Sequence, residues 1–214
     1  MNYTFSRFAI LACLLLASCG PKALTLPEQP VDRAATCGIV AAAGARLAVT
    51  DVSAPLPLAE HGRIVGYALL AASASGQYDQ QIAGAVSQRM QSLQDRVTSG
   101  EWQPLTAECK TAYPAAEKQD VTLPEDKFEA QLQCNELARF MAQALTGQAG
   151  SYRNEIADYR HLHERLNDRI AAALNAKAGP KVGDQQKLRH RALAVASRLG
   201  APIATLSRCL ERFP

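Results

Sequence analysis

The sequence predicts an all-α protein made of two similar helical units. Aromatic residues make up only 6% of the 214-residue chain, whereas alanine, leucine, glutamine and arginine, which favour helices over strands, recur throughout. Apolar residues recur at helical spacing, most clearly in the series Ile82, Val86, Met90, Leu93 and Val97, which steps by four, four, three and four positions. A repeated cysteine pattern divides the expected helices into two halves.

Each half is expected to contain four helices. In the first half they are residues 34–49, residues 58–75, residues 82–97 and a short helix with Leu105, Cys109 and Tyr113 on one face. In the second half they are residues 126–146, residues 152–174, residues 188–199 and a last helix with Leu206, Cys209 or Leu210, and Phe213 on its apolar face. Glycine, or glycine followed by proline, ends several of them, at Gly100, Gly147 and Gly179.

The cysteines carry the repeat. Cys109 begins Cys-Lys-Thr-Ala-Tyr-Pro and Cys209 begins Cys-Leu-Glu-Arg-Phe-Pro, so both segments read Cys-x-x-x-aromatic-Pro. Cysteine and ring four positions apart share a helix face, so the ring of Tyr113 or Phe213 could cover a disulfide, and the proline would end the helix. A binding role for either ring is the alternative. The matching spacings suggest an internal duplication.

The N-terminal segment is typical of an export signal. Arg7 is the only charged residue among the first eighteen, and the apolar run that follows it is too short to span a bilayer. The run ends in Leu16-Ala17-Ser18-Cys19, which resembles the lipobox of a bacterial lipoprotein signal peptide. The resemblance implies that Cys19 becomes the first residue, carries lipid and anchors the chain in the cell envelope, facing the periplasm. Gly20 after this cysteine would favour the outer membrane.

Export places the remaining cysteines in an oxidising compartment, where cysteines tend to pair. Cys13 is lost with the signal and Cys19 carries lipid, so four cysteines remain. Four cysteines allow three pairings, and sequence alone does not select one. The two-half pattern favours Cys37–Cys109 and Cys134–Cys209, which would join the first and last helices of each half.

The expected organisation divides the chain into five parts. They are a signal peptide (1–18), a flexible tether (19–32), helical unit one (33–114), an acidic linker (115–127) and helical unit two (128–214). Residues 19–133 carry nine Lys and Arg against thirteen Asp and Glu, whereas residues 134–214 carry thirteen against seven. The halves could attract one another, the basic half could face anionic lipid or polymer, or both could simply be solvated faces.

No sequence motif indicates catalysis or a cofactor. There is no Cys-x-x-Cys-His, His-Glu-x-x-His or Gly-x-Ser-x-Gly. His161 and His163 point to different sides of a helix, which predicts a core histidine at position 163 and not a metal pair. The basic run Gln186–Arg191 favours contact with lipid or cell-wall polymer over nucleic acid. We therefore expect no metal, no cofactor and no catalytic residue.

The expected function is that of a non-catalytic lipoprotein that acts by protein binding, in an assembly, inhibitor or immunity-type role. Its partners would be the membrane, through the lipid on Cys19, and a protein of unknown identity. The main alternative is a carrier of a small apolar ligand or lipid between the two units. The residues proposed to line its pocket are Tyr67, Met90, Phe140 and Tyr159. A third class is an enzyme whose site the sequence does not display.

Overall fold

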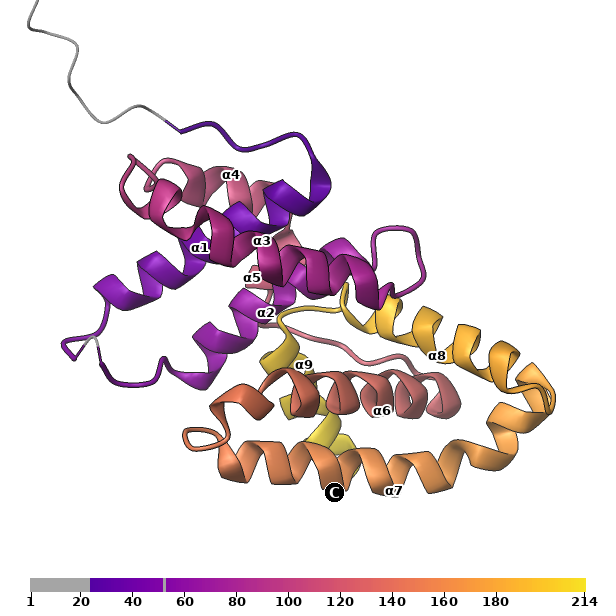
Figure 1. Cartoon of the computed structure of the whole chain (residues 1–214). Helices are drawn as coiled ribbons and strands as arrows, with labels where there is room; N and C mark the ends of the chain where they lie inside the picture. Colours follow the sequence, from indigo (N-terminus) through magenta and orange to yellow (C-terminus); the bar gives the residue numbers. More distant parts are fainter. Residues whose placement is uncertain (1–23, 52) are drawn as a thin grey trace, which may run out of the picture.

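The computed structural model describes residues 24–51 and 53–214, so the predicted signal peptide and Cys19 lie outside the described residues. The described chain is helical, without a β-strand, which confirms the predicted all-α class (Figure 1). Its elements are α1 (Pro30–Leu47), α2 (Leu58–Ala72), α3 (Gln80–Thr98), α4 (Leu105–Ala112), α5 (Pro114–Glu117), α6 (Lys127–Ala144), the 3₁₀ helix η1 (Thr146–Gln148), α7 (Arg153–Ala178), α8 (Val182–Ala196) and α9 (Pro202–Arg212).

Unit one consists of α1–α5 and is built around α1. Residues 34–41 are buried without interruption, because α2, α3 and α4 pack around this helix. Gln29 caps α1, where its side-chain Oε1 accepts a hydrogen bond from Val31 N at 2.8 Å. The helix therefore begins inside the predicted tether, and Leu24 and Leu26 also pack against the core of unit one.

Unit two consists of α6–α9 and is built in the same way around α6. Residues 130–138 of this helix are all buried, because α7, α8 and α9 pack against it. Figure 1 shows α6 lying between α7 and α8, which form a long helical hairpin. Asp126 caps α6, with its carboxylate accepting from Glu129 N at 2.8 Å.

A disulfide joins the central helix of each unit to its last long helix. Cys37 of α1 is bonded to Cys109 of α4, and Cys134 of α6 is bonded to Cys209 of α9, the pairing that the two-half pattern predicts. The ends of α4 and α9 also match. Tyr113 (φ −132°, ψ 62°) and Phe213 (φ −131°, ψ 64°) both end their helices, and each donates its backbone N–H to the cysteine carbonyl four residues earlier at 2.9 Å.

The two rings pack as the cysteine motif predicts. Tyr113 contacts the apolar cluster that contains Cys37 and Cys109, and Phe213 belongs to the cluster that contains Cys134 and Cys209. Each ring thus packs in the same apolar cluster as the disulfide of its unit. The common origin of the two units by duplication stays a prediction.

The two units pack into one body through α2, which contacts α8 and α9. Gly62 permits the close approach, because a Cβ at this position would lie 2.3 Å from Cγ1 of Ile203. Polar contacts cross the same boundary. Arg198 donates to the carbonyl of Ser73 at 2.8 Å, and the Tyr152 hydroxyl donates to a backbone carbonyl that precedes α2 at 2.5 Å.

The predicted acidic linker is packed against both units. Its first residues form α5, where the Glu117 carboxylate accepts hydrogen bonds from Arg63 of α2 at 3.2 and 3.3 Å. Further along, Ala201 of unit two donates its backbone N–H to a carbonyl of the segment at 2.8 Å. The side chain of Val121 is buried. Most of the polar residues of this segment are exposed, but its few apolar residues and its carbonyls also hold it against both units.

Candidate functional site: a buried carboxylate and two arginines

Unit two contains a carboxylate with no solvent exposure, Glu136 in the middle of α6. Its Oε2 accepts hydrogen bonds from Nε and Nη2 of Arg139 at 3.2 and 2.9 Å. Its Oε1 accepts from Nη1 of Arg189 at 2.5 Å and from Nδ2 of Asn135 at 2.9 Å. Each carboxylate oxygen therefore has two donors, as a buried charge requires.

Two side chains of α7 extend this cluster. Because Asn135 donates to Glu136 through its amide nitrogen, its Oδ1 is an acceptor, and Nδ1 of His163 donates to it at 2.9 Å. Nη2 of Arg189 donates to Oδ1 of Asn167 at 2.8 Å. The cluster thus joins α6, α7 and α8 by side-chain hydrogen bonds. We call these six residues, namely Asn135, Glu136, Arg139, His163, Asn167 and Arg189, the Glu136 cluster.

Helical spacing brings these side chains together. Glu136 and Arg139 are three residues apart on α6, and His163 and Asn167 are four residues apart on α7, so each pair shares one helix face. The shared face of α7 turns toward α6, since the neighbouring Leu162 and Leu166 are fully buried in the core of unit two. Arg189 reaches the carboxylate from α8, on the other side of α6.

The cluster has an excess of positive charge. It combines one carboxylate with two guanidinium groups. Burial lowers the pKa of His163, an effect that nearby Glu136 only partly opposes, and this favours the neutral imidazole. The carboxylate is enclosed, whereas the side chains of Arg139 and Arg189 are 42% and 23% exposed. The two charged side chains of the cluster that are partly exposed are therefore both cationic.

The geometry favours binding of an anion over acid–base chemistry. Glu136 has no solvent contact and both its oxygens are occupied, so it has no free position from which to take a proton from a substrate. Guanidinium groups, by contrast, recognise carboxylates and phosphates through their N–H donors. Over residues 24–51 and 53–214, no group of three or more His, Cys, Asp or Glu side chains gathers in the manner of a metal site.

The two histidines of α7 differ in exposure, and so do the basic residues of the run 186–191. His161 is exposed and lies 3.7 Å from Glu164, whereas His163 is half-buried in the Glu136 cluster. In the run 186–191, Lys187 is exposed but Arg189 turns inward to Glu136. The sequence expectation of a surface basic run therefore missed its inward-facing member.

Sequence reasoning also missed Glu136, although a signal for its partner was present. Arg189 precedes Cys209 by twenty positions, and Arg89 precedes Cys109 by the same number. Both arginines form ion pairs with the central helix of their unit. If the cysteine repeat had been extended to include this arginine, it would have predicted that Arg189 contacts another helix of its own unit.

The side chains proposed to line an apolar ligand pocket are spread over three apolar clusters. Tyr67 packs beside the disulfide of unit one, Met90 packs in the other cluster of that unit, and Tyr159 lies in the core of unit two. Phe140 makes an edge contact with Tyr78, with ring centroids 5.6 Å apart. A shallow pocket of about 340 Å³ lies elsewhere. Its lining residues are Val121, Thr122, Leu123, Arg208, Glu211 and Arg212.

Comparison with known proteins gives this chain no relative. No protein-family model, curated protein or solved structure matches it. Within the described ranges, none of the helices is both long and apolar enough to cross a membrane. The function must therefore be inferred from the Glu136 cluster, the disulfides and the N-terminal sequence.

Proposed function

We propose that this chain is a lipid-anchored, non-catalytic protein of the bacterial cell envelope that acts by binding a protein partner. The Glu136 cluster is the observation that carries the proposal. Its carboxylate is enclosed and fully bonded, and the charged side chains that are partly exposed are those of two arginines held in place. Such an arrangement suits recognition of a charged partner better than chemistry on a substrate.

The bracing of the molecule supports a binding role. A disulfide closes each unit, and α2 packs the two units together. A surface fixed in this way loses little conformational entropy when it binds, which favours affinity. The same disulfides fit the oxidising compartment that the lipobox implies.

The proposed anchor lies on the side of unit one. Leu24 is packed close to Gly100, where an added Cβ would lie 3.0 Å from the leucine side chain. Cys19 is five residues before Leu24, and five extended residues span at most about 18 Å, so the proposed lipid would be attached on this side of the molecule. Figure 1 shows α6, α7 and α8 at the opposite end of the molecule from the start of the described chain. Unit two would then extend away from the membrane.

The partner is tested by crosslinking in intact cells, followed by capture of the full chain from gently solubilised membranes. We expect one envelope protein to be enriched and to capture this chain in the reciprocal experiment. An unrelated lipoprotein of similar abundance is the control. The proposal is wrong if no reciprocal partner is found, or if denaturation of the purified chain releases a stoichiometric apolar molecule, as a ligand carrier would.

The anchor is tested separately with Cys19→Ala. We expect this variant to leave the membrane fraction, and mass spectrometry of the wild-type chain to find a diacylated or triacylated N-terminal cysteine. Retention of Cys19→Ala in the membrane fraction, with no lipid on the wild-type N-terminus, would contradict the anchor without affecting the partner experiment.

A further inference from the structure

The position of Glu136 is filled differently in the two units. Glu136 follows Cys134, the first cysteine of unit two, by two residues. Ile39 follows Cys37, the first cysteine of unit one, by the same number. Both side chains are buried within the central helix of their unit, with Ile39 only 4% exposed. Unit one therefore shows that the same kind of helical unit forms with an apolar residue at this position.

Stability alone gives little reason to keep a carboxylate at this place. Removing a carboxylate from water costs several kcal/mol, and replacing a buried ion pair by packed apolar residues is often neutral or stabilising. The carboxylate does, however, fix two guanidiniums. Both Nε and Nη2 of Arg139 are bonded to Glu136, which sets the plane of this guanidinium while leaving its Nη1 unbonded to any described residue. Arg189 is fixed by Glu136 and Asn167 together.

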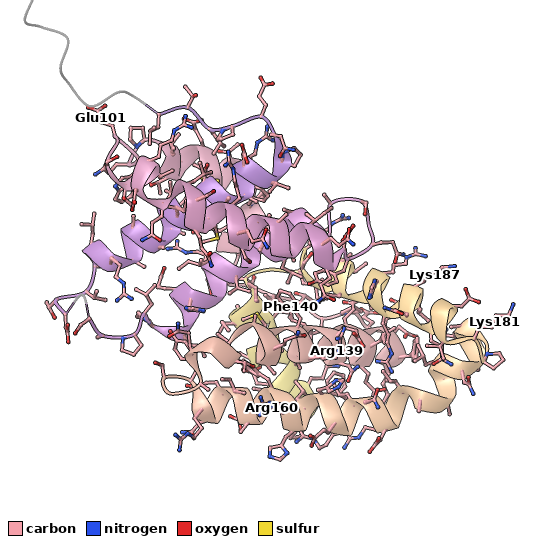
Figure 2. The ribbon with its side chains drawn as sticks, in the orientation of Figure 1. Glu101, Arg139, Phe140, Arg160, Lys181 and Lys187 are labelled. Atoms are coloured by element: carbon pink, nitrogen blue, oxygen red, sulfur yellow. A yellow bond between two sulfur atoms is a disulfide. The ribbon has the colours of Figure 1, made fainter. Side chains whose placement is uncertain are left out.

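We propose that Arg139 and Arg189, oriented by Glu136, form a binding site for a carboxylate group of the protein partner, and this inference rests on the proposed function. The two guanidiniums contact the two oxygens of one carboxylate, so Glu136 holds both of them. Figure 2 shows Arg139 on α6 between the two helices of the α7–α8 hairpin. A second carboxylate can bind on the exposed side of this pair through the remaining N–H donors.

The charge of unit two favours an acidic protein partner. Residues 134–214 carry thirteen Lys and Arg against seven Asp and Glu, and this excess attracts an anionic surface before contact. A lipid phosphate offers similar anionic acceptors, but the proposed anchor places the membrane beside unit one. We therefore assign the site to an Asp or Glu side chain, or a C-terminal carboxylate, of a protein.

The test compares Arg139→Gln with the matched control Arg160→Gln. Arg160 lies on the exposed side of α7 in the same unit and forms no ion pair among the described side chains. Both variants remove one positive charge from unit two. The full lipidated chain in detergent micelles is titrated with fluorescent poly-L-glutamate. We expect Arg139→Gln to weaken binding roughly tenfold, the loss of one charge-assisted hydrogen bond, and Arg160→Gln to weaken it less than about twofold.

Glu136→Gln separates orientation from total charge. This variant raises the net charge of unit two by one, so non-specific attraction predicts tighter binding of poly-L-glutamate. Orientation by the carboxylate predicts weaker binding, by about threefold or more, because the guanidiniums lose their strongest acceptor. Thermal unfolding shows whether Glu136→Gln folds. If it does not, Arg139→Gln decides the test, because the side chain of Arg139 is partly exposed.

Each other outcome overturns part of the proposal. Equal weakening by Arg139→Gln and Arg160→Gln means that the attraction is non-specific and that the site does not exist. Binding to phosphatidylglycerol vesicles that depends on Arg139, with no binding of poly-L-glutamate, replaces the protein carboxylate by a lipid phosphate. If Arg139→Gln captures the partner as well as the wild type, the site is wrong and the proposed function stands. If the wild type captures no partner, the proposed function itself is wrong.

Discussion

The two units each connect an arginine of their third helix to their central helix, but at different depths. In unit one, Arg89 of α3 pairs with Asp32 in the first turn of α1 at 2.6 Å, and the side chains are 40% and 31% exposed. In unit two, Arg189 of α8 pairs with the fully enclosed Glu136. Each arginine is twenty residues before the last cysteine of its unit, yet Arg89 forms a surface ion pair and Arg189 forms a buried one.

The difference between the pairs follows from what surrounds them. Asp32 is solvated, and the hydrogen bond from Arg89 lowers the pKa of its carboxyl group. Deeper in unit one, the residues after the leading cysteine are Gly38 and Ile39. The side chain of Met90 covers Gly38 so closely that an added Cβ would lie 2.8 Å from its methyl carbon. Apolar side chains in unit one therefore occupy the place that the hydrogen-bonded Glu136 cluster occupies in unit two.

The largest expected effect comes from moving the charge into the apolar unit. Ile39→Glu places a carboxylate in the apolar cluster that Ile39 shares with residues such as Val86, Leu93 and Leu105. We expect the free energy of unfolding to fall by about 5 kcal/mol, since the charge is buried without a partner. Urea denaturation measures the loss, with Ile39→Val as the control, at about 1 kcal/mol. Similar losses for the two variants would mean that unit one can also accommodate a carboxylate at this position.

The disulfides should differ in importance between the units. Helix α4 buries only Leu105 and Cys109, whereas α9 buries four residues. Replacing both cysteines of the Cys37–Cys109 pair by serine should therefore cost about 4 kcal/mol, and replacing both of the Cys134–Cys209 pair about 3 kcal/mol. Urea denaturation of the two double variants, with thiol mapping to confirm the remaining disulfide, tests this order. The reverse order would show that packing of α9 depends on its disulfide more than its burial indicates.

Neutralising one acid in each unit tests the comparison most directly. Glu136→Gln should lower the free energy of unfolding by about 2 kcal/mol, because four hydrogen bonds lose their charged acceptor in a buried site. Asp32→Asn should leave it nearly unchanged, since this pair is exposed and screened by water. The two variants are measured by urea denaturation in parallel at low and high salt. Equal losses would show that burial does not distinguish the two pairs.

The features that sequence predicted correctly are those with a repeated pattern. The all-α class, the series from Ile82 to Val97 and the two cysteine pairs all follow from spacing, and the structure has each of them. In that series Val86, Leu93 and Val97 are buried as the spacing requires. Spacing was informative here because every helix of a small unit has to bury one face.

The features that sequence missed depend on contacts between distant residues. Glu136 is followed by the buried residues Leu137 and Ala138, and a charged residue in such a helix is normally assigned to its solvated edge. Its burial depends on Arg189, which is 53 positions away and on another helix. The attachment of the acidic segment after Pro114 was missed for the same reason, because it depends on Arg63 and Ala201, which are distant in the sequence.

The smallest expected effect concerns one partly buried histidine in each unit, His61 and His163. His61 of α2 packs its ring 5.4 Å from that of Tyr152, and burial lowers its pKa from 6.5. Burial also lowers the pKa of His163, but Glu136 partly opposes this effect. In both cases the unfolded chain binds the proton more readily. The stabilisation is therefore complete above about pH 6.5 and is lost as the pH falls through the pKa of the folded state.

Because nothing offsets the effect at His61, its replacement should change the pH dependence more. We expect His61→Gln to reduce the loss of unfolding free energy between about pH 7.5 and pH 5.5 by up to about 1 kcal/mol, and His163→Gln to reduce it less. Urea denaturation at several pH values in this range measures both, with the exposed His161→Gln as the control. A larger change for His163→Gln would mean that Glu136 does not moderate the titration of its neighbour. Burial in the Glu136 cluster would then disfavour protonation of His163 as strongly as burial beside Tyr152 disfavours protonation of His61.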